Sequence, residues 1–248
     1  MKVALITGGS SGIGAATARE LLERRWAVVL AARGRPRLEA TARRLARHGG
    51  AVLPIPADVS QPDQAEALVA QAAAWKGRLD AVINAAGAAP LAPLARLSAA
   101  QWRRILDTNL SAVFHTTRAA WPIFGRQHRR RAKGRPRLGA TGWTGTVVNI
   151  SSEASRDPFA GLGAYGAAKA ALNLLTRVIA REGLAIGVRA VAIAPGAVDT
   201  PMFRALPFAG QVAAEALLAP QDVAAAIVAA LEGSLWCASG ETIFIHAR

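Results

Sequence analysis

The sequence predicts an α/β fold in one domain, a sandwich of helices around a mainly parallel, doubly wound sheet of seven strands. Three observations predict it. Short apolar runs alternate with helix-length amphipathic segments from one end of the chain to the other. Most of these runs are continuously apolar, as expected for strands that are covered on both faces. A glycine-rich turn joins the first run to the first helical segment.

The strands and helices are expected in strict alternation. The expected strands are Val3–Ile6, Ala27–Ala31, Val52–Ile55, Ala81–Ile83, Val147–Ile150, Val188–Ile193 and Thr242–Ile245. The helical patterns lie at 13–25, 36–48, 61–75, 98–121, 161–182 and 220–232. Ser98 and Gln101 form a capping-box pattern, and Pro220 suits a first helical turn. Since no Ser/Gly-rich linker divides the chain, a single domain over 1–248 is expected.

The positive charge of the chain is concentrated in two segments. The formal net charge is +14, with 52% hydrophobic and 19% charged residues, a composition typical of globular proteins. Residues 125–137, GRQHRRRAKGRPR, hold seven positive residues and no acid, and residues 33–47 hold six arginines and one glutamate. The rest of the chain is nearly neutral, so the total charge alone does not predict nucleic-acid binding.

The sequence favours a cytoplasmic location. Cys237 is the single cysteine, which excludes an intrachain disulfide and suits a reducing compartment. The apolar run in MKVALITGG is too short for a signal peptide, and no uncharged run reaches the length of a bilayer. No membrane partner is therefore expected.

The first strand leads into Thr7-Gly8-Gly9-Ser10-Ser11-Gly12-Ile13-Gly14 and then a helix. Glycines permit a tight turn, and they let backbone N–H groups approach a pyrophosphate at the positive end of the helix. The spacing is Gly-x-x-x-Gly-x-Gly. We interpret this turn as a dinucleotide site; the alternative is a purely structural strand–turn–helix.

The end of the second strand indicates the type of dinucleotide. An acidic residue about 20 positions after the glycines would bind the ribose 2′-hydroxyl of NAD. Here the chain reads Ala31-Ala32-Arg33-Gly34-Arg35, with no acid before Glu39. A guanidinium offers paired, charge-assisted hydrogen bonds to a phosphate, so Arg33, aided by Arg35 or Arg37, favours NADP(H) over NAD(H). A solvated helix face is the alternative.

The only tyrosine, Tyr165, stands four positions before Lys169. Together with the glycine turn, this pair makes the chain resemble the short-chain dehydrogenase/reductase family, whose fold is Rossmann-type. Five further segments resemble the family in order over nearly the whole chain: Asp58-Val59, Asn84-Ala85-Ala86-Gly87, Asn109 in LDTNLSAVF, Asn149-Ile150-Ser151-Ser152, and Pro195-Gly196-Ala197-Val198-Asp199-Thr200.

The resemblance implies four catalytic residues: Asn109, Ser152, Tyr165 and Lys169. Tyr165 would exchange a proton with the substrate oxygen, and Lys169 would lower its pKa and hold the nicotinamide ribose. Ser152, which precedes Tyr165 by the family's 13 positions, would bind the substrate oxygen. Asn109 would anchor a water-mediated proton relay. A packing tyrosine and a strand-end serine are the alternatives.

The resemblance also implies a set of cofactor contacts and no metal. The contacts are Gly8, Ser10, Ser11, Gly12, Ile13, Gly14, Arg33, Asp58, Val59, Asn84, Ala85, Gly87, Tyr165, Lys169, Pro195, Gly196, Val198 and Thr200. Two features depart from the family. The link at 125–145 is long and is expected to be a basic surface loop away from the cleft, either an exposed insertion or a site for an acidic partner. The ending GETIFIHAR lacks the family's usual aspartate and paired glycines.

The expected substrate is a small ketone or secondary alcohol. Three variable segments, Ala88–Leu97, Glu153–Leu162 and Pro201–Ala214, should line a fairly open and mainly apolar cleft. Two other functions stay open: an NAD-dependent dehydrogenase, and a non-catalytic nucleotide-binding protein that binds a polyanion through 125–137. Nucleic acid is not the expected partner, and the family resemblance implies a homodimer or homotetramer.

Overall fold

The computed structural model describes residues 1–47, 49–131 and 142–247. Within them, seven strands form one sheet in the order β3-β2-β1-β4-β5-β6-β7, and every pairing is parallel. The strands are β1 (Val3–Thr7), β2 (Ala27–Ala32), β3 (Val52–Pro56), β4 (Ala81–Asn84), β5 (Gly145–Ile150), β6 (Val188–Pro195) and β7 (Thr242–Ile245). The predicted doubly wound α/β sheet is confirmed.

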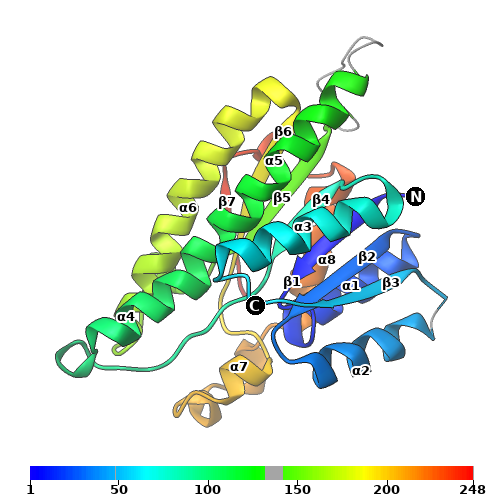
Figure 1. Ribbon diagram of the computed structural model, residues 1–248. Helices are drawn as coiled ribbons and strands as arrows, with labels where there is room; N and C mark the ends of the chain where they lie inside the picture. The colour runs from blue at the N-terminus through cyan, green and yellow to red at the C-terminus, as the bar shows by residue number, and fades with distance from the viewer. Residues whose placement is uncertain (48, 132–141, 248) are drawn as a thin grey trace.

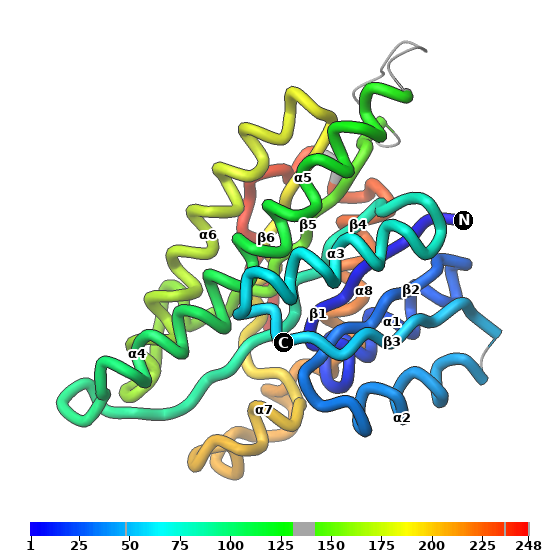
Figure 2. The backbone as a smooth tube through the Cα atoms, in the orientation of Figure 1, coloured from blue at the N-terminus to red at the C-terminus, as the bar shows by residue number. Residues whose placement is uncertain are grey.

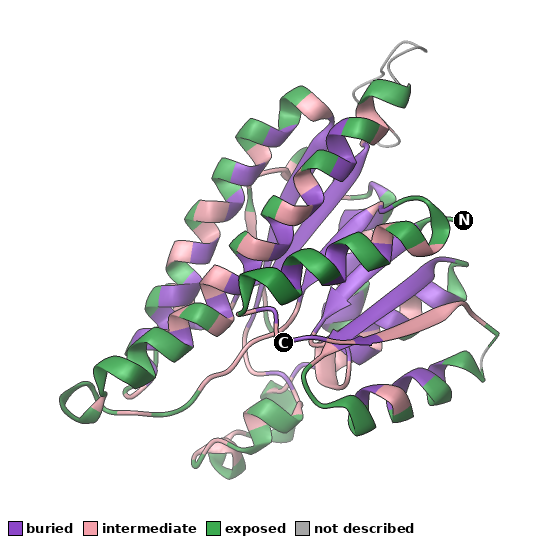
Figure 3. Cartoon of the chain, in the orientation of Figure 1, coloured by how far each residue is buried: buried purple, intermediate pink, exposed green. Residues whose placement is uncertain are grey.

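Helices cover both faces of the sheet (Figure 1). They are α1 (Gly12–Glu23), α2 (Arg35–Ala46), α3 (Pro62–Lys76), α4 (Ala99–Leu106), α5 (Ala112–Arg131), α6 (Gly163–Gly183), α7 (Pro201–Arg204) and α8 (Pro220–Glu232). Helices α1, α2 and α8 pack into one apolar core, and α3, α5 and α6 into the other. Successive strand residues such as Leu5 and Ile6 enter opposite cores, which explains why the strands read as continuous apolar runs. Most of the sheet is accordingly buried (Figure 3).

The predicted helix over 98–121 is interrupted and then extended. The capping box at Ser98 forms as predicted, with its backbone N–H donating to Gln101 Oε1 at 2.9 Å and its hydroxyl accepting from the Gln101 N–H at 3.2 Å. A π-helical turn, η2 (Asp107–Ser111), separates α4 from α5. Helix α5 then continues through Pro122, because the residues beyond it pack against the sheet.

The prediction that 125–145 is a loop was wrong for its first residues, which belong to α5. Phe124 is fully buried, and Gln127 exchanges hydrogen bonds with the backbone of Leu79, accepting at 2.9 Å and donating at 2.7 Å. These contacts stabilise the helical conformation of the residues that follow Gly125. Residues 132–141 of the predicted loop lie outside the described part of the chain.

The parallel order brings the carboxyl ends of the strands to one edge of the sheet, and the chain returns to this edge near its C-terminus (Figure 2). The β1–α1 turn, Ser152 after β5, and the residue after β7 all emerge there. None of the helices in the described ranges is both long and apolar enough to span a bilayer.

Candidate active site

A cleft of about 630 Å³ opens at the carboxyl ends of β1, β2 and β4. The glycine turn forms one wall. Gly8 has φ +68°, and a Cβ placed on it would lie 2.7 Å from the carbonyl oxygen of Ala85. Gly12 has φ +50°, and its Cβ would lie 3.1 Å from Thr200. At Gly8 and Gly12 the turn therefore has no side chain beside the cleft, which suits the close approach of a pyrophosphate to the backbone.

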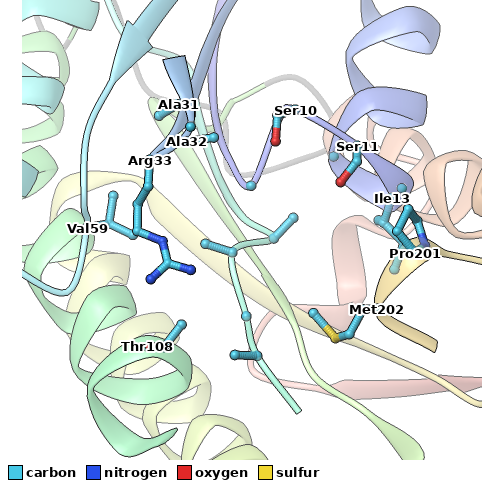
Figure 4. Close-up of a pocket in the computed structure, with 18 of the residues that line it drawn as sticks. Ser10, Ser11, Ile13, Ala31, Ala32, Arg33, Val59, Thr108, Pro201 and Met202 are labelled. Atoms are coloured by element: carbon cyan, nitrogen blue, oxygen red, sulfur yellow. The ribbon is translucent and has the colours of Figure 1, made fainter. Parts of the chain in front are cut away.

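The N-terminus of α1 is available to an anion. Ser11 is the N-cap residue in an extended conformation, and its side chain makes no capping hydrogen bond. The hydroxyl groups of Ser10 and Ser11 point into the cleft (Figure 4). The first N–H groups of a helix lack intrahelical partners, so a phosphate fits this end of the helix.

Two arginines line the same cleft. The guanidinium of Arg33 extends between Val59 and Thr108 (Figure 4), and Arg37 lies one helical turn further along the chain. Across the described residues, neither forms an ion pair, whereas Arg35 pairs with Glu39 at 3.4 Å on the surface of α2. Among the described residues, Arg33 and Arg37 therefore line the cleft without an acidic partner, whereas the charge of Arg35 is paired with that of Glu39.

Most of the predicted cofactor residues meet in two adjoining clefts. The larger cleft is lined by Gly8, Ser10, Ser11, Gly12, Ile13, Gly14, Arg33, Asp58, Val59, Ala85, Gly87 and Thr200. The second, of about 380 Å³, is lined by Ser152, Tyr165, Lys169, Pro195, Gly196 and Val198. Ile13, Ala85, Gly87, Ala89, Thr200 and Met202 border both clefts, so the two are continuous.

Asn84 lines neither cleft. Its amide nitrogen donates to Asn149 Oδ1 at 2.9 Å, and its oxygen accepts from Thr116 at 2.8 Å. Asn149 in turn donates to Thr176 at 2.9 Å. This buried chain of hydrogen bonds joins β4 and β5 to α5 and α6, and α6 carries the tyrosine and lysine. Asn84 therefore supports the position of α6 through this chain and does not line either cleft.

Tyr165 and Ser152 meet in the second cleft. Ser152 follows β5 in an extended conformation, and its Oγ accepts a hydrogen bond of 3.2 Å from the N–H of Ala154. Tyr165 lines the same cleft, and the side chain of Ser152 acts to lower the pKa of its phenol. Lys169, one turn further along α6, is buried and donates to the carbonyl oxygen of Ile150 at 2.7 Å. Its Nζ lies 5.5 Å from the centre of the tyrosine ring.

Burial controls the ionisation of this pair. It raises the pKa of Tyr165 above its ordinary value of 10.0, and the side chain of Ser152 offsets only part of that rise. Burial also lowers the pKa of Lys169 from 10.5 to about 8. The expected lowering of the pKa of Tyr165 is thus not found, because removing the phenolate from water outweighs the effect of Ser152.

Asn109 lies in η2 and is fully buried behind Gly87. Its amide nitrogen donates to the carbonyl oxygens of Ala88 and Ile105, each at 2.9 Å, and its oxygen accepts from the Ala88 N–H at 3.3 Å. A Cβ on Gly87 would lie 2.9 Å from that oxygen and 3.9 Å from Lys169 Nζ. Asn109 lines neither cleft. Its hydrogen bonds hold Ala88, and with it Gly87, which lies between η2 and Lys169.

Comparison with known proteins identifies the family. A model described as short chain dehydrogenase matches residues 2–208. The chain belongs to the short-chain dehydrogenase/reductase family. It is an oxidoreductase of that family, which binds a nicotinamide cofactor and acts on small molecules.

Relatives and solved structures agree with this assignment. The chain is 38% identical to cis-4-hydroxycyclohexanecarboxylate dehydrogenase of Sinomonas cyclohexanicum, over 91% of this chain and 87% of that protein. It is 30% identical to an uncharacterized oxidoreductase of Staphylococcus epidermidis, over 93% and 90%. It superposes with a TM-score of 0.86 on 3-ketoacyl-(acyl-carrier-protein) reductase from Brucella melitensis complexed with NADH, at 26% identity over 99% and 97% of the two chains.

The second cleft of this short-chain dehydrogenase is mainly apolar. From the three predicted segments it takes Ala89, Phe159, Leu162, Met202, Phe203, Leu206, Phe208 and Val212. Phe208 lies between Phe159 and Phe203, with ring centres 5.3 and 6.4 Å apart. The three rings connect the segment after β5 to the segment after β6.

Sequence reasoning missed two residues of this cleft, Ala216 and His246. His246 directly follows β7, and the sequence predicts a strand over Thr242–Ile245 in a mainly parallel sheet. The carboxyl end of that strand must reach the same edge as Ser152. The strand order was therefore a signal that could have placed His246 in the site.

Proposed function

We propose that this short-chain dehydrogenase transfers hydride between NADP(H) and a small carbonyl compound or secondary alcohol, with Tyr165 as the general acid/base. The observation that carries the proposal is that Tyr165, Ser152 and Lys169 line one cleft, which is continuous with the glycine-lined cleft. A packing tyrosine would not require a serine and a lysine in the same cleft.

The side chains divide the work as follows. Ser152 donates a hydrogen bond to the substrate oxygen and stabilises the negative charge that develops on it. Tyr165 donates its proton to that oxygen during reduction and removes it during oxidation. Lys169 supplies a positive charge beside the phenol and a donor for the ribose, and Asn109 anchors the proton relay behind it. The bound nicotinamide supplies or accepts the hydride.

Arg33 and Arg37 support NADP(H) as the cofactor. Both line the glycine cleft without an ion-pair partner among the described residues, and both therefore offer charge to a 2′-phosphate. The Brucella melitensis reductase was complexed with NADH, so a preference for NAD(H) is the competing proposal. The thermal shift at equal concentrations of NADPH and NADH separates the two, because the tighter ligand raises the melting temperature more.

The substrate that we propose has an apolar, ring-sized body. The aromatic and aliphatic lining of the second cleft supports this. The Sinomonas relative is named for its action on a hydroxylated cyclohexane ring, which makes cyclohexanones and cyclohexanols the first compounds to assay.

We also propose that the protein is cytoplasmic and functions as a single-domain homodimer or homotetramer. Apolar side chains on α5 and α6 support self-association: Phe114, Leu174 and Val178 are 40 to 63% exposed. Light scattering on the eluted protein gives the mass that decides this.

The decisive experiment follows NADPH absorbance over a panel of ketones, with cyclohexanones included. We expect the wild type to oxidise NADPH and Tyr165→Phe to lose about 10²–10⁴-fold in kcat while it still binds NADPH. Full activity in Tyr165→Phe refutes the proposed mechanism. Absence of turnover across the panel in both directions refutes the oxidation–reduction of carbonyl compounds.

A further inference from the structure

Three polar side chains, Glu153, Arg156 and His246, form a hydrogen-bonded cluster beside the second cleft. Arg156 Nε donates to Glu153 Oε1 at 2.6 Å, and Arg156 Nη2 lies 3.3 Å from His246 Nε2. The guanidinium carbon of Arg156 also lies 3.9 Å from the ring centre of Phe244. Glu153 and His246 line the cleft, whereas Arg156 does not. The carboxylate and the ring together hold the guanidinium, and this fixes the direction from which it meets the imidazole.

The contact with Arg156 determines which nitrogen of His246 carries the proton. A guanidinium has donors only, so His246 Nε2 must be the acceptor. An imidazole with an accepting Nε2 carries its single proton on Nδ1. Glu153 Oε2 agrees with this assignment. It lies 3.3 Å from Nε2, yet it is buried and accepts no hydrogen bond from any group in the described part of the chain.

The Nδ1–H group of His246 is available to a ligand. Among the described residues, none forms a hydrogen bond with Nδ1. A Cβ on Gly196 would lie 3.2 Å from this atom, so Nδ1 lies beside a part of the cleft wall that has no side chain. The side chain of His246 is 47% exposed. A molecule in the second cleft can therefore accept a hydrogen bond from Nδ1.

The cluster carries no net charge in this state. The guanidinium of Arg156 offsets the carboxylate of Glu153, and an imidazole with one proton is neutral. An anionic group beside His246 would meet the carboxylate of Glu153 in the cleft wall without an unpaired cation next to it. A neutral oxygen, in contrast, needs only the N–H group. The cluster therefore suits an uncharged acceptor.

We propose that His246 is a specificity-determining residue, whose Nδ1–H group donates a hydrogen bond to an uncharged oxygen at the non-reacting end of the substrate. Arg156 is the positioning residue that keeps the proton on Nδ1. This inference rests on the proposed function: Ser152 and Tyr165 hold the reacting oxygen, and the apolar walls hold the body of the substrate. The substrate class is then a ketone with a second, neutral oxygen function, such as a hydroxyl, ether or ester, or the corresponding alcohol.

The first test compares methoxycyclohexanones with ethylcyclohexanones, substituted at ring position 2, 3 or 4, using NADPH. The two members of each pair have the same number of heavy atoms and differ in one acceptor. We expect the wild type to prefer the methoxy compound by about threefold to tenfold in kcat/KM in at least one pair, the effect of one hydrogen bond. This preference should arise mainly through KM.

Two variants of His246 are matched controls for each other. In His246→Asn the amide nitrogen is bonded to Cγ, as Nδ1 is, whereas in His246→Gln it lies one bond further away, as Nε2 does. His246→Asn should therefore keep part of the methoxy preference, and His246→Gln should bring the ratio to one or below. Both substitutions change a partly exposed side chain. Melting curves verify that the variants fold.

The position of the proton is measured directly by NMR of the imidazole nitrogens in ¹⁵N-labelled protein, at a pH high enough that every histidine ring is neutral. The signals of His246 are assigned by their absence from His246→Asn. We expect Nδ1 to be protonated in the wild type. In Arg156→Gln the proton should move toward Nε2, where it can reach the unpartnered oxygen of Glu153.

Binding is measured with NADP, which cannot reduce a ketone, so that the inference is tested without turnover. Calorimetry should show the same threefold to tenfold preference for the methoxy ketone in the dissociation constants. If none of the ketones is reduced with NADPH, the proposed function fails, and the affinity ratio with NADP and the NMR spectrum decide the inference. A proton on Nε2 in the wild type, or a methoxy preference that is equal in the wild type and His246→Gln, overturns it.

Discussion

Lys169 donates a hydrogen bond of 2.7 Å to the carbonyl oxygen of Ile150, at the last residue of β5. The bond joins α6, the helix that carries Tyr165, to the strand that ends beside Ser152. It also keeps an ammonium away from water, and burial lowers the pKa of that ammonium to about 8. Burial of this ammonium costs stability, so its presence suggests selection for activity at the expense of stability.

We therefore expect Lys169→Met to abolish turnover and to stabilise the fold. A pKa that falls from 10.5 to about 8 corresponds to at most about 3 kcal/mol at neutral pH. The loss of the bond to Ile150 offsets part of this. The free energy of unfolding at pH 7 should thus rise by about 1–2 kcal/mol, as measured by urea denaturation.

The pH dependence provides the control for this variant. Between about pH 8 and 10.5 the unfolded chain holds more protons at this lysine than the folded chain does, so the wild type gains stability as the pH rises. The advantage of Lys169→Met should be complete below pH 8 and should disappear above 10.5. A difference that does not vary with pH would show that packing, rather than charge, explains the effect.

Gly87→Ala should disturb the segment that Asn109 holds. The new Cβ would lie 2.9 Å from Asn109 Oδ1, closer than a carbon and an oxygen can pack without movement. We expect a loss of about 1–3 kcal/mol of stability and a lower kcat. Gly210→Ala, at a position with open space around the new methyl group, is the matched control and should change neither. Equal melting temperatures for the wild type and Gly87→Ala would contradict the expected crowding.

The double variant Arg33→Ser, Arg37→Ser should weaken NADPH binding by about tenfold to hundredfold and leave NADH binding unchanged. Both arginines line the glycine cleft, and NADPH differs from NADH by the phosphate that they would bind. Arg35→Ser is the control, because Arg35 pairs with Glu39 on the surface. Fluorescence titration of the wild type and both variants with each dinucleotide measures the six dissociation constants. Equal losses for the two dinucleotides would assign Arg33 and Arg37 to the shared part of the cofactor.

The buried hydrogen-bond chain behind the site offers a paired test of stability. Thr176→Val removes the acceptor of Asn149 Nδ2 and should cost about 1–3 kcal/mol. Thr117→Val is its counterpart, since the described residues offer no hydrogen bond to the buried hydroxyl of Thr117. That substitution should be neutral or stabilising. Thermal unfolding compares the two, and a larger loss for Thr117→Val than for Thr176→Val would contradict the proposed bracing role.

The sequence by itself determined the sheet, the helices and most of the site. Apolar runs with turn residues between them are local signals, and they predicted all seven strands within one or two residues. The Tyr165–Lys169 spacing is also local, because a helix places residues four apart on one face. The glycine turn and Ser152 follow directly from the ends of β1 and β5, so their place at one edge of the sheet was predictable from a parallel order.

Only the tertiary structure decided which distant residues meet. Phe124 and Gln127 extend α5 past a proline through contacts with the sheet and with Leu79. Arg35 pairs with Glu39 on the surface of α2 and does not line the glycine-lined cleft. His246 lies 3.3 Å from Glu153, although the two are 93 positions apart in the chain. Burial, rather than the side chain of Ser152, determines the direction of the shift in the pKa of Tyr165. Periodicity in a sequence reports the neighbours of a residue along the chain, whereas charge balance and desolvation depend on the residues that folding brings beside it.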